Sequence, residues 1–403
     1  MPAERLLQLT ELLRENAQYW RCQPFMAAPE WADDSPLTDH LNAIDDASLL
    51  AAQACDEALI SALTRVLPTQ CEAIKQLCEL PAPDLTRRSP GNGLSKEPSH
   101  VPGRKWAQIC AFCDALPAPE HPLLDWCSGK AHLGREIHTR HGQPVTALEI
   151  DPILVEAGNT LSGNDPIHIH RCDVLSPEAR HFLDTNQQIV ALHACGELHR
   201  KLLRDAVAVG CEQISWSPCC YHKFLPGEYS PLSQLGQAQG LNLTSAEIRG
   251  AVRQNSTAGH AEKQRFVEHQ SWRLGFDALQ RSVRGKDTYL HTPPLNRLNQ
   301  PKTFREFAEQ AARYRQIQLP QQLDYPAFEK RGRERYQIVA RQELVRELFR
   351  RPLELWLVLD QMMFLEENGY RCRWVAFCET ELTPRNILVD AIRTPSPTGR
   401  GLG

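Results

Sequence analysis

Short apolar runs alternate with helical or polar segments between residues 122 and 217. Strands that are buried on both faces of a sheet have nearly continuous apolar sequences, and helical crossovers between them make the sheet parallel. The pattern therefore predicts an α/β fold in which helices cover both faces of a parallel sheet. The five predicted strands are Leu123–Asp125, Val145–Leu148, Ile167–His170, Gln188–His193 and Cys211–Ser217.

Helical spacing of apolar residues predicts helices on either side of this region. The stretch 225–350 is too long for a loop and predicts a helical insertion. Two further strands, Tyr370–Phe377 and Asn386–Ile392, bring the sheet to seven strands. The predicted domains are, in chain order, a helical N-terminal domain (1–80), a linker rich in Pro, Gly and Ser (81–103), the first part of the α/β core (104–224), the helical insertion (225–350), the final helix and two strands of the core (351–393) and a disordered tail (394–403).

Small residues follow the first predicted strand, in a tight turn that leads into a helix ending at His141-Gly142. Small side chains let the backbone approach a ligand, and the start of the helix offers free N–H groups. Glu149 ends the next strand, 24 residues after Asp125, where an acid can accept both hydrogen bonds of a ribose diol. The turn predicts a nucleotide-type cofactor, although a tight turn in any α/β protein is the alternative. Cys127 and Ala131 stand where such turns often have glycine.

The strand ends carry a series of motifs, DWCSGKAHLG, ALEID, CDV, LHACGELH and SPCCYHKF. This series resembles a family of methyltransferases that use S-adenosylmethionine (SAM), and it is distantly similar to a tRNA ribose methyltransferase with a Cys-Cys-x-His segment. The resemblance implies a seven-stranded Rossmann-like class I methyltransferase sheet with SAM at its carboxyl edge. The cofactor-binding residues assigned by the pattern and the resemblance are Lys105, Asp125, Cys127, Ser128, Gly129, Glu149, Asp151, Asp173, His193, Cys195 and Gly196.

Three of these assignments have structural alternatives. Glu149 is expected at the ribose, but a solvated acid at a strand end has the same sequence signature. Asp173 is expected at the adenine amine, and its alternative is a cap on the helix that starts near Ser176. Lys105 is expected to reach the SAM carboxylate or a substrate phosphate, unless it belongs to a solvated basic helix start.

The second half of the site is predicted to align a methyl acceptor. His193 or His222 serves as the base, because an unperturbed imidazole titrates near neutral pH. Cys219, Cys220 and Tyr221 are expected to line the acceptor slot. Three alternatives remain: a covalent cysteine nucleophile, a metal site that adds Cys195 and His222 to the two cysteines, and plain packing of small thiols. The prediction is a slot without metal.

Charge is distributed unevenly along the chain. Residues 247–351 hold 21 Lys and Arg against 12 Asp and Glu, while the whole chain has a net charge of −4. Aromatic residues are interleaved with these cations, as in Arg265-Phe266, Trp272-Arg273 and Arg313-Tyr314-Arg315. Phosphates require distributed cations and unpaired bases require flat side chains, so the insertion predicts RNA binding. A solvated helical face with mixed charges is the alternative.

Composition narrows the class of protein. The chain is 42% hydrophobic and 23% charged, no apolar run approaches the length of a membrane span, and the first 18 residues do not form a signal peptide. The 14 cysteines therefore predict reduced thiols in the cytoplasm. Cys110 and Cys113 have metal-like spacing but no second pair, so buried thiols are expected there.

The combined prediction is a cytoplasmic SAM-dependent methyltransferase that acts on RNA, with tRNA as a specific candidate. A protein or small-molecule methyltransferase is the alternative, as is a non-catalytic scaffold that keeps the SAM fold. The sequence gives no indication of the oligomeric state.

Overall fold

The computed structural model describes all residues except 34, 82–100, 252–259, 294–297 and 395–403. Most of the predicted linker and all but the first residue of the predicted tail lie outside the described residues. The chain divides into two compact units. The first unit consists of Met1–Glu15, Ile74–Arg253 and Arg350–Gly403, and the second of Asn16–Ala73 and Gln254–Phe349.

The first unit is built on the predicted seven-stranded sheet, with the strand order β3-β2-β1-β4-β5-β7-β6. The first five strands are parallel, β7 is antiparallel to β5, and β6 is antiparallel to β7. The strands are β1 (Leu123–Trp126), β2 (Val145–Glu149), β3 (Ile167–Arg171), β4 (Gln188–Leu192), β5 (Gln213–Ser217), β6 (Tyr370–Ala376) and β7 (Ile387–Arg393). The predicted fold class is confirmed.

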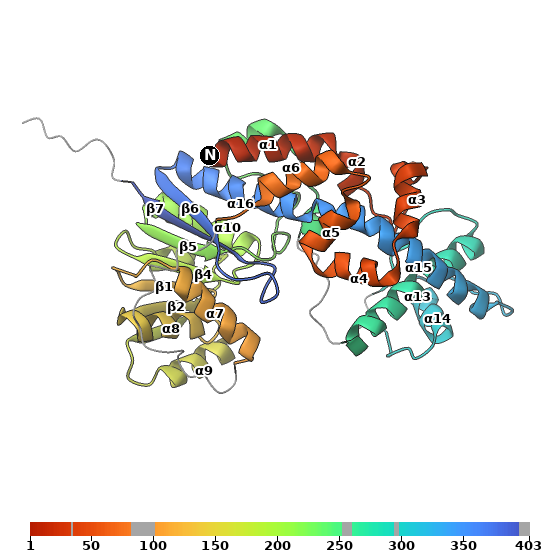
Figure 1. Ribbon diagram of the computed structural model, residues 1–403. Coiled ribbons are helices and arrows are strands. Elements are labelled where there is room, and N and C mark those ends of the chain that lie inside the picture. The colour runs from red at the N-terminus through yellow and green to blue at the C-terminus, as the bar shows by residue number, and fades with distance from the viewer. Residues whose placement is uncertain (34, 82–100, 252–259, 294–297, 395–403) are drawn as a thin grey trace, which may run out of the picture. The chain divides into compact units, whose positions relative to one another are not determined.

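Helices cover both faces of this sheet, as expected for buried parallel strands (Figure 1). Helices α7 and α8 share an apolar cluster with β1, β2 and β4, whereas α10 and α16 pack against the strands from β5 to β6. The α8 helix ends at Gly142, whose φ of 75° supplies the left-handed stop predicted from the sequence. The helices of this unit are α1 (Pro2–Glu15), α7 (Gly103–Ala115), α8 (His132–His141), α9 (Pro152–Ser162), the 3-10 helix η3 (Pro177–Phe182), α10 (Glu197–Val209), α11 (Gln234–Gln239), α12 (Ser245–Ala251) and α16 (Arg350–Glu367).

A buried carboxylate on α16 fixes the chain that follows β5. Asp360 accepts hydrogen bonds from the Tyr229 hydroxyl at 2.7 Å and from the backbone N–H groups of Leu232 and Ser233 at 2.8 and 3.0 Å. Buried polar groups need such partners, so Asp360 specifies one path for this segment. The residues from 225 to 251 therefore belong with the sheet unit, although the sequence assigns them to the insertion.

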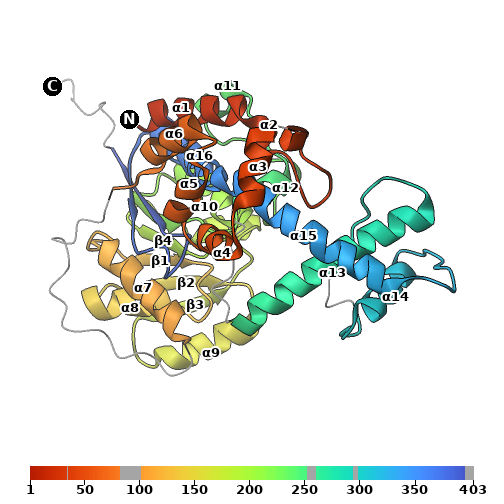
Figure 2. The ribbon, with the colours of Figure 1, turned by 45° about the vertical axis from the view of Figure 1, so that its right-hand side comes forward.

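The second unit is helical and combines the chain near the N-terminus with the later part of the predicted insertion. Its helices α13 and α15 cross each other, with α14 beside them (Figure 2). The helices are α2 (Ala17–Trp20), the 3-10 helix η1 (Glu30–Asp33), α3 (Ser35–Ala43), α4 (Asp46–Ala54), α5 (Asp56–Leu63), the N-terminal part of α6 (Pro68–Cys78), α13 (His260–Arg284), α14 (Phe304–Tyr314) and α15 (Tyr325–Leu348). Residues 1–15 pack with the sheet unit instead, so the domain boundaries predicted at 80 and 224 differ from the edges of the compact units.

No helix within the described parts of the chain combines the length and the apolar character needed to cross a membrane.

The crossing of α13 and α15 requires glycine on both helices. A Cβ on Gly332 would overlap the Ser271 carbonyl oxygen and approach the backbone N of Gly275 to 2.6 Å. We predict that Gly332→Ala destabilises this unit by about 1–3 kcal/mol, because overpacking outweighs the gain in helix propensity. Chemical denaturation monitored by circular dichroism measures the change.

Glu334→Ala is the matched control on the same helix, since Glu334 is exposed and its Lys330 partner lies 3.8 Å away. Its unfolding free energy should stay within about 0.5 kcal/mol of the parent. A stabilised Gly332→Ala variant would contradict the close crossing.

Candidate active site

The carboxyl ends of five parallel strands bring the predicted site residues to one edge of the sheet. The register pairs Trp126 of β1 with Leu148 of β2, and Leu192 of β4 with Ser217 of β5. Each strand end is followed directly by one of the sequence motifs. Ligands of open parallel sheets bind at this edge, so the topology assembles the site from segments far apart in sequence.

The turn after β1 adopts left-handed backbone conformations without a full set of glycines. Cys127, Gly129 and Ala131 have φ values of 59°, 60° and 55°. A left-handed residue with a side chain costs roughly 1–2 kcal/mol, and such strain concentrates at functional sites. Cys127 and Ala131 thus adopt a backbone conformation that glycine adopts at lower cost. A Cβ on Gly129 would meet nothing within 4 Å, so open space lies beside this residue.

Asp125 is buried next to the turn and is hydrogen-bonded to the helix that follows it. Its side chain is buried, and Oδ2 accepts a 3.1 Å hydrogen bond from the N–H of Gly134 in the first turn of α8. Burial raises the pKa of Asp125 to about 7, while the hydrogen bond from Gly134 and the charge of Arg135 act in the opposite direction. In this structure Asp125 positions the start of α8.

Glu149 is held at the end of β2 by two backbone donors. Oε2 accepts from the N–H of Gly129 at 2.9 Å, and Oε1 accepts from the N–H of Asp151 at 2.9 Å. Each carboxylate oxygen keeps a second acceptor position, so the pair remains suited to a ribose diol. Asp151 itself caps α9 by accepting from the N–H of Ile153 at 2.9 Å, which explains its presence structurally.

Two apolar side chains beside Glu149 were missed by the sequence analysis. Ile150 is 57% exposed and Ile153 is 73% exposed, next to a strand end where a buried residue would be ordinary. An exposed isoleucine offers an apolar contact of the kind that can pack against the face of an adenine ring. No sequence signal separates these isoleucines from core residues, because only the fold decides their exposure.

Asp173 forms a local turn after β3. Its Oδ1 accepts from the N–H of Leu175 at 2.9 Å, and its side chain is exposed. The cap of the 3-10 helix η3 is Ser176, so the predicted alternative of Asp173 as that helix cap is wrong. The exposed carboxylate still has acceptor capacity for an amine.

Lys105 lies in the first turn of α7, and its side chain is exposed. Its charge contributes to lowering the pKa values of His132 and His193 and counteracts the raised pKa of Asp125. The charge of Lys105 therefore acts on groups on both sides of the turn after β1.

His193 directly follows β4 in a left-handed conformation, with φ at 71°. Displacement of water by the surrounding chain lowers its pKa, and the charge of Lys105 adds to the effect. The ring is thus neutral at physiological pH, which is the state that accepts a proton.

Gly196 allows the loops after β4 and β5 to touch. A Cβ at this position would overlap the carbonyl oxygen of Lys223, and the N–H of Glu197 donates to that same oxygen at 3.0 Å. Gly196 is therefore explained by the contact between the loops, and no side chain can replace it without separating them.

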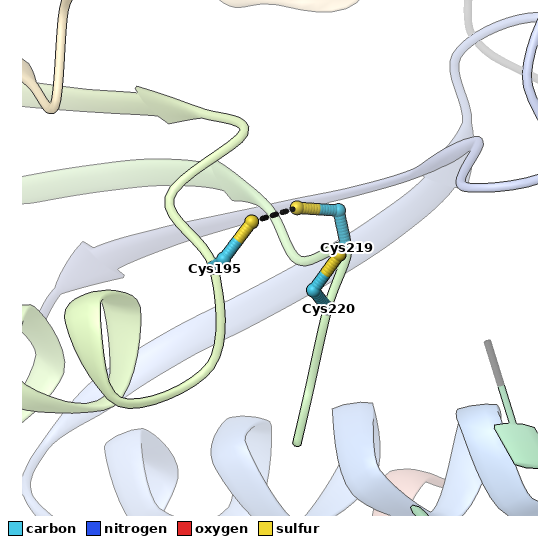
Figure 3. A group of neighbouring side chains, drawn as sticks. All are labelled: Cys195, Cys219 and Cys220. Carbon is cyan, nitrogen blue, oxygen red and sulfur yellow. Dashed lines mark hydrogen bonds between the residues drawn. The ribbon is translucent and has the colours of Figure 1, made fainter. Parts of the chain in front are cut away.

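The two loops bring three predicted residues together as a thiol cluster of Cys195, Cys219 and Cys220 (Figure 3). The Sγ atoms of Cys195 and Cys219 are 3.1 Å apart, and all three sulfur atoms lie within 4.8 Å of one another. Hydrogen bonds from the other two thiols lower the pKa of Cys220, with Lys223 and His222 contributing in the same direction. Cys220 is therefore the thiol that ionises most readily.

Tyr221 and His222 differ from the expected slot. Tyr221 is buried, its ring packs edge-on against His199, and its hydroxyl has no hydrogen-bond partner among the described residues. The Tyr221 side chain is therefore packed in the interior beneath the loop. The prediction that it lines the acceptor slot is corrected accordingly. Nδ1 of His222 is enclosed and likewise has no partner within the described chain. Burial lowers the pKa of His222, and Arg249 lowers it further.

Cys110 and Cys113 are buried in the apolar cluster around α7, as predicted.

Residues 104–226 match the model of a family described as a methyltransferase domain. The matched region is about a third of the chain, and it contains the five parallel strands of the sheet.

Several solved methyltransferases align with the chain. The 23S rRNA methyltransferase ErmE is 18% identical, over 35% of this chain and 55% of its own length, with a TM-score of 0.24. Magnesium protoporphyrin IX methyltransferase from Synechocystis, with bound SAH, is 10% identical over 77% of this chain and 94% of its own, with a TM-score of 0.30. Coclaurine N-methyltransferase, bound to N-methylheliamine and SAH, is 11% identical over 89% of this chain and 97% of its own, with a TM-score of 0.27. This chain thus spans about half of ErmE, and TM-scores this low carry no argument about the substrate.

Glu149→Gln tests the ribose contact. The amide loses one acceptor oxygen, so we predict that affinity for SAM and S-adenosylhomocysteine falls roughly 10-fold to 100-fold, measured by titration calorimetry. Glu156→Gln, an exposed substitution on α9, is the control and should bind as the parent does. Equal affinities in the two variants would contradict the contact.

Asp125→Asn tests the buried carboxyl under the turn. Because the folded pKa is raised above the unfolded value, the folded state holds an extra proton between roughly pH 4 and pH 7 and loses stability as pH rises through this window. The Asn variant lacks this loss, so we predict that the parent loses up to about 4 kcal/mol relative to it between pH 4 and pH 8. Urea unfolding across this range measures the difference, and a pH-independent difference would refute the raised pKa.

Proposed function

We propose that this protein is a SAM-dependent methyltransferase and that its acceptor is an RNA. The main observation in favour of SAM is the hydrogen bond between Glu149 and the N–H of Gly129. It holds a carboxylate that suits a ribose next to a turn with open space beside it. The match to a methyltransferase domain over residues 104–226 supports the same proposal.

The residues present fit an adenosyl group. Gly129 leaves open space where a Cβ would otherwise stand, Glu149 offers a carboxylate, and Ile150 offers an exposed apolar surface. Asp173 adds an exposed acceptor at the next strand end for the adenine amine. When bound, SAM supplies an electrophilic methyl group.

The chain itself positions the acceptor and takes up a proton. His193 is the proposed base, since its ring is exposed at the end of β4 and its lowered pKa keeps Nδ1 or Nε2 unprotonated. His222 is less suited to this role because its Nδ1 is enclosed. Lys105 supplies a positive charge that suits the carboxylate of SAM or a phosphate of the acceptor.

The helical unit supports RNA as the acceptor, but with fewer groups than its composition suggests. Arg281 and Arg335 both bind the buried carboxylate of Asp277, at 3.0 and 2.7 Å. Trp272 is buried in the core of this unit and cannot stack on a base. Part of the basic surplus therefore holds the unit together.

The remaining RNA-binding candidates are exposed on α13 and α14. Phe266 and Tyr314 are 47% and 43% exposed, and each is adjacent to an exposed arginine, Arg265 or Arg313. A flat ring beside a guanidinium group is the combination that binds an unpaired base and its phosphate. These four residues form the proposed RNA-binding set.

Transfer of methyl label decides between acceptor classes. Purified protein with labelled SAM should label the RNA fraction of a lysate from a strain that lacks the gene. Label in protein or metabolites, with none in RNA, would favour the alternative acceptors. A chain that binds neither SAM nor S-adenosylhomocysteine would be the non-catalytic scaffold.

Tyr314→Ala and Arg313→Ala test the RNA-binding set. We predict that Tyr314→Ala weakens RNA binding about 10-fold or more through lost stacking, and that Arg313→Ala reduces the salt dependence of binding by about one phosphate contact. Filter binding over a salt series measures both effects.

Arg333→Ala is the matched control, because Arg333 is exposed but paired with Glu329 at 3.0 Å. It should change RNA affinity less than twofold. RNA affinity that does not depend on salt in the parent protein would refute the proposed surface.

A further inference from the structure

We propose that the thiol cluster is a binding site for Zn²⁺, and that His222 turns its imidazole toward the cluster to supply the fourth ligand when the metal binds. The cluster holds three sulfur atoms within 4.8 Å of one another, and thiolate and imidazole are the ligands that Zn²⁺ prefers. This site is independent of the identity of the methyl acceptor. The sequence predicts a slot without metal, whereas the fold brings three thiols into a group that can hold a cation.

The sulfur positions are close to those of a tetrahedral site. Zn–S bonds of about 2.3 Å place the sulfur atoms of a tetrahedral centre roughly 3.8 Å apart. The 3.1 Å separation of Cys195 and Cys219 needs to open by only several tenths of an ångström, which a small rotation of one thiol provides. Figure 3 shows Cys195 on one loop directed toward Cys219 and Cys220 on the other.

The backbone already holds these two loops together. β4 and β5 are parallel neighbours, and the N–H of Glu197 donates to the carbonyl oxygen of Lys223 at 3.0 Å. His193, Gly196 and Phe224 have left-handed φ values of 71°, 58° and 59°, so the residues flanking the cluster are constrained. A cation bound across the loops stabilises an arrangement that would otherwise carry strain.

His222 is the candidate for the position that the three thiols leave open. Its imidazole has to turn toward them, because its nitrogen atoms are not among the ligand atoms that lie within 4.8 Å of one another. Its Nδ1 is enclosed and has no hydrogen-bond partner within the described chain, an unfavourable state for a buried polar atom. It follows Cys220 by two residues, in the order Cys-Cys-Tyr-His. Four protein ligands make a closed site, so the proposed role of the metal is to fix the two loops.

The surrounding charges suit this ligand set. Zn²⁺ with three thiolates and a neutral imidazole has a net charge of −1. Lys223 acts electrostatically on Cys220, and Arg249 acts on His222. Two cations therefore lie near the excess negative charge. Loading the site releases the protons of the bound thiols to solvent, and no oxidation or reduction occurs.

A second cysteine pair provides an internal comparison. Cys110 and Cys113 have the spacing of a metal motif, but both are packed in the apolar cluster around α7. Within the described chain, the one group of three or more metal-ligating side chains is the thiol cluster. Cys110→Ala is therefore a control that removes a buried thiol and no proposed ligand.

The first experiment measures metal in the full-length protein, purified under reducing conditions without chelator. Elemental analysis should give about one zinc per chain, and replacement by Co²⁺ should produce the intense visible absorption of a tetrahedral site with sulfur-to-cobalt charge transfer. Absence of both signals overturns the proposal. A mass lower by two hydrogen atoms, mapped to a Cys195–Cys219 disulfide in the freshly purified protein, also overturns it.

Variants then assign the ligands. Cys219→Ala and Cys220→Ala should each lose at least 10-fold in Co²⁺ affinity and reduce the charge-transfer intensity, whereas Cys110→Ala should match the parent. His222→Ala should keep the charge transfer and change the visible bands, because a water replaces one nitrogen ligand. An unchanged spectrum in His222→Ala overturns the histidine ligand, and an unchanged affinity in Cys219→Ala overturns the site.

Folding is checked separately by circular dichroism and by SAM binding at the Glu149 side of the sheet edge. If Cys219→Ala does not fold, Cys195→Ser is tested in its place, with the same expected loss of Co²⁺ affinity. Metal binding without methyl transfer would support the zinc site and contradict the proposed function. Methyl transfer without metal binding would support the proposed function and contradict the zinc site.

Discussion

The parallel hydrogen bonding of β2, β1, β4 and β5 is the constraint on which the site depends. Parallel pairing makes every carboxyl end point to the same edge, so residues that are separated by up to about a hundred positions become neighbours. Glu149 can then accept a hydrogen bond from Gly129, and Cys195 can approach Cys219. A register change of one residue in any of these strands would exchange the buried and exposed faces and separate these groups.

Backbone conformation gives this edge its shape. Left-handed residues occur after β1 and after β4, and several of them, including Cys127, Ala131 and His193, carry side chains. Glycine would be less strained in each place, so the surrounding hydrogen bonds must hold these conformations. The N–H groups of Ser128 and Gly129, which donate to Leu148 and Glu149 of the next strand, provide part of that support. The rigid turn and the pre-placed carboxylate reduce the ordering that a ligand would otherwise have to impose.

Part of the positive charge of the second unit takes part in ion pairs within that unit. Two arginines share the carboxylate of Asp277, which is buried and needs compensation. Several aromatic residues of the same region, among them Trp272, Phe276 and Phe307, form a buried core. A sequence count of cations and rings therefore overstates the surface available to a nucleic acid, and a smaller set on α13 and α14 remains.

The sequence by itself determined where the strands lie along the chain, because burial on both faces of a parallel sheet demands apolar runs. The order of the strands in the sheet and the antiparallel direction of β6 and β7 came from the tertiary structure. The sequence also located the strand-end residues, since ligand sites of such sheets lie at one edge. Only the tertiary structure decided that Tyr221 is buried, that Ile150 is exposed and that three cysteines from two loops form one cluster. The division into units was also undetermined by the sequence, because contacts between distant helices do not follow chain order. Local periodicity records which side of an element is apolar, but the partner that covers that side is set by packing in three dimensions.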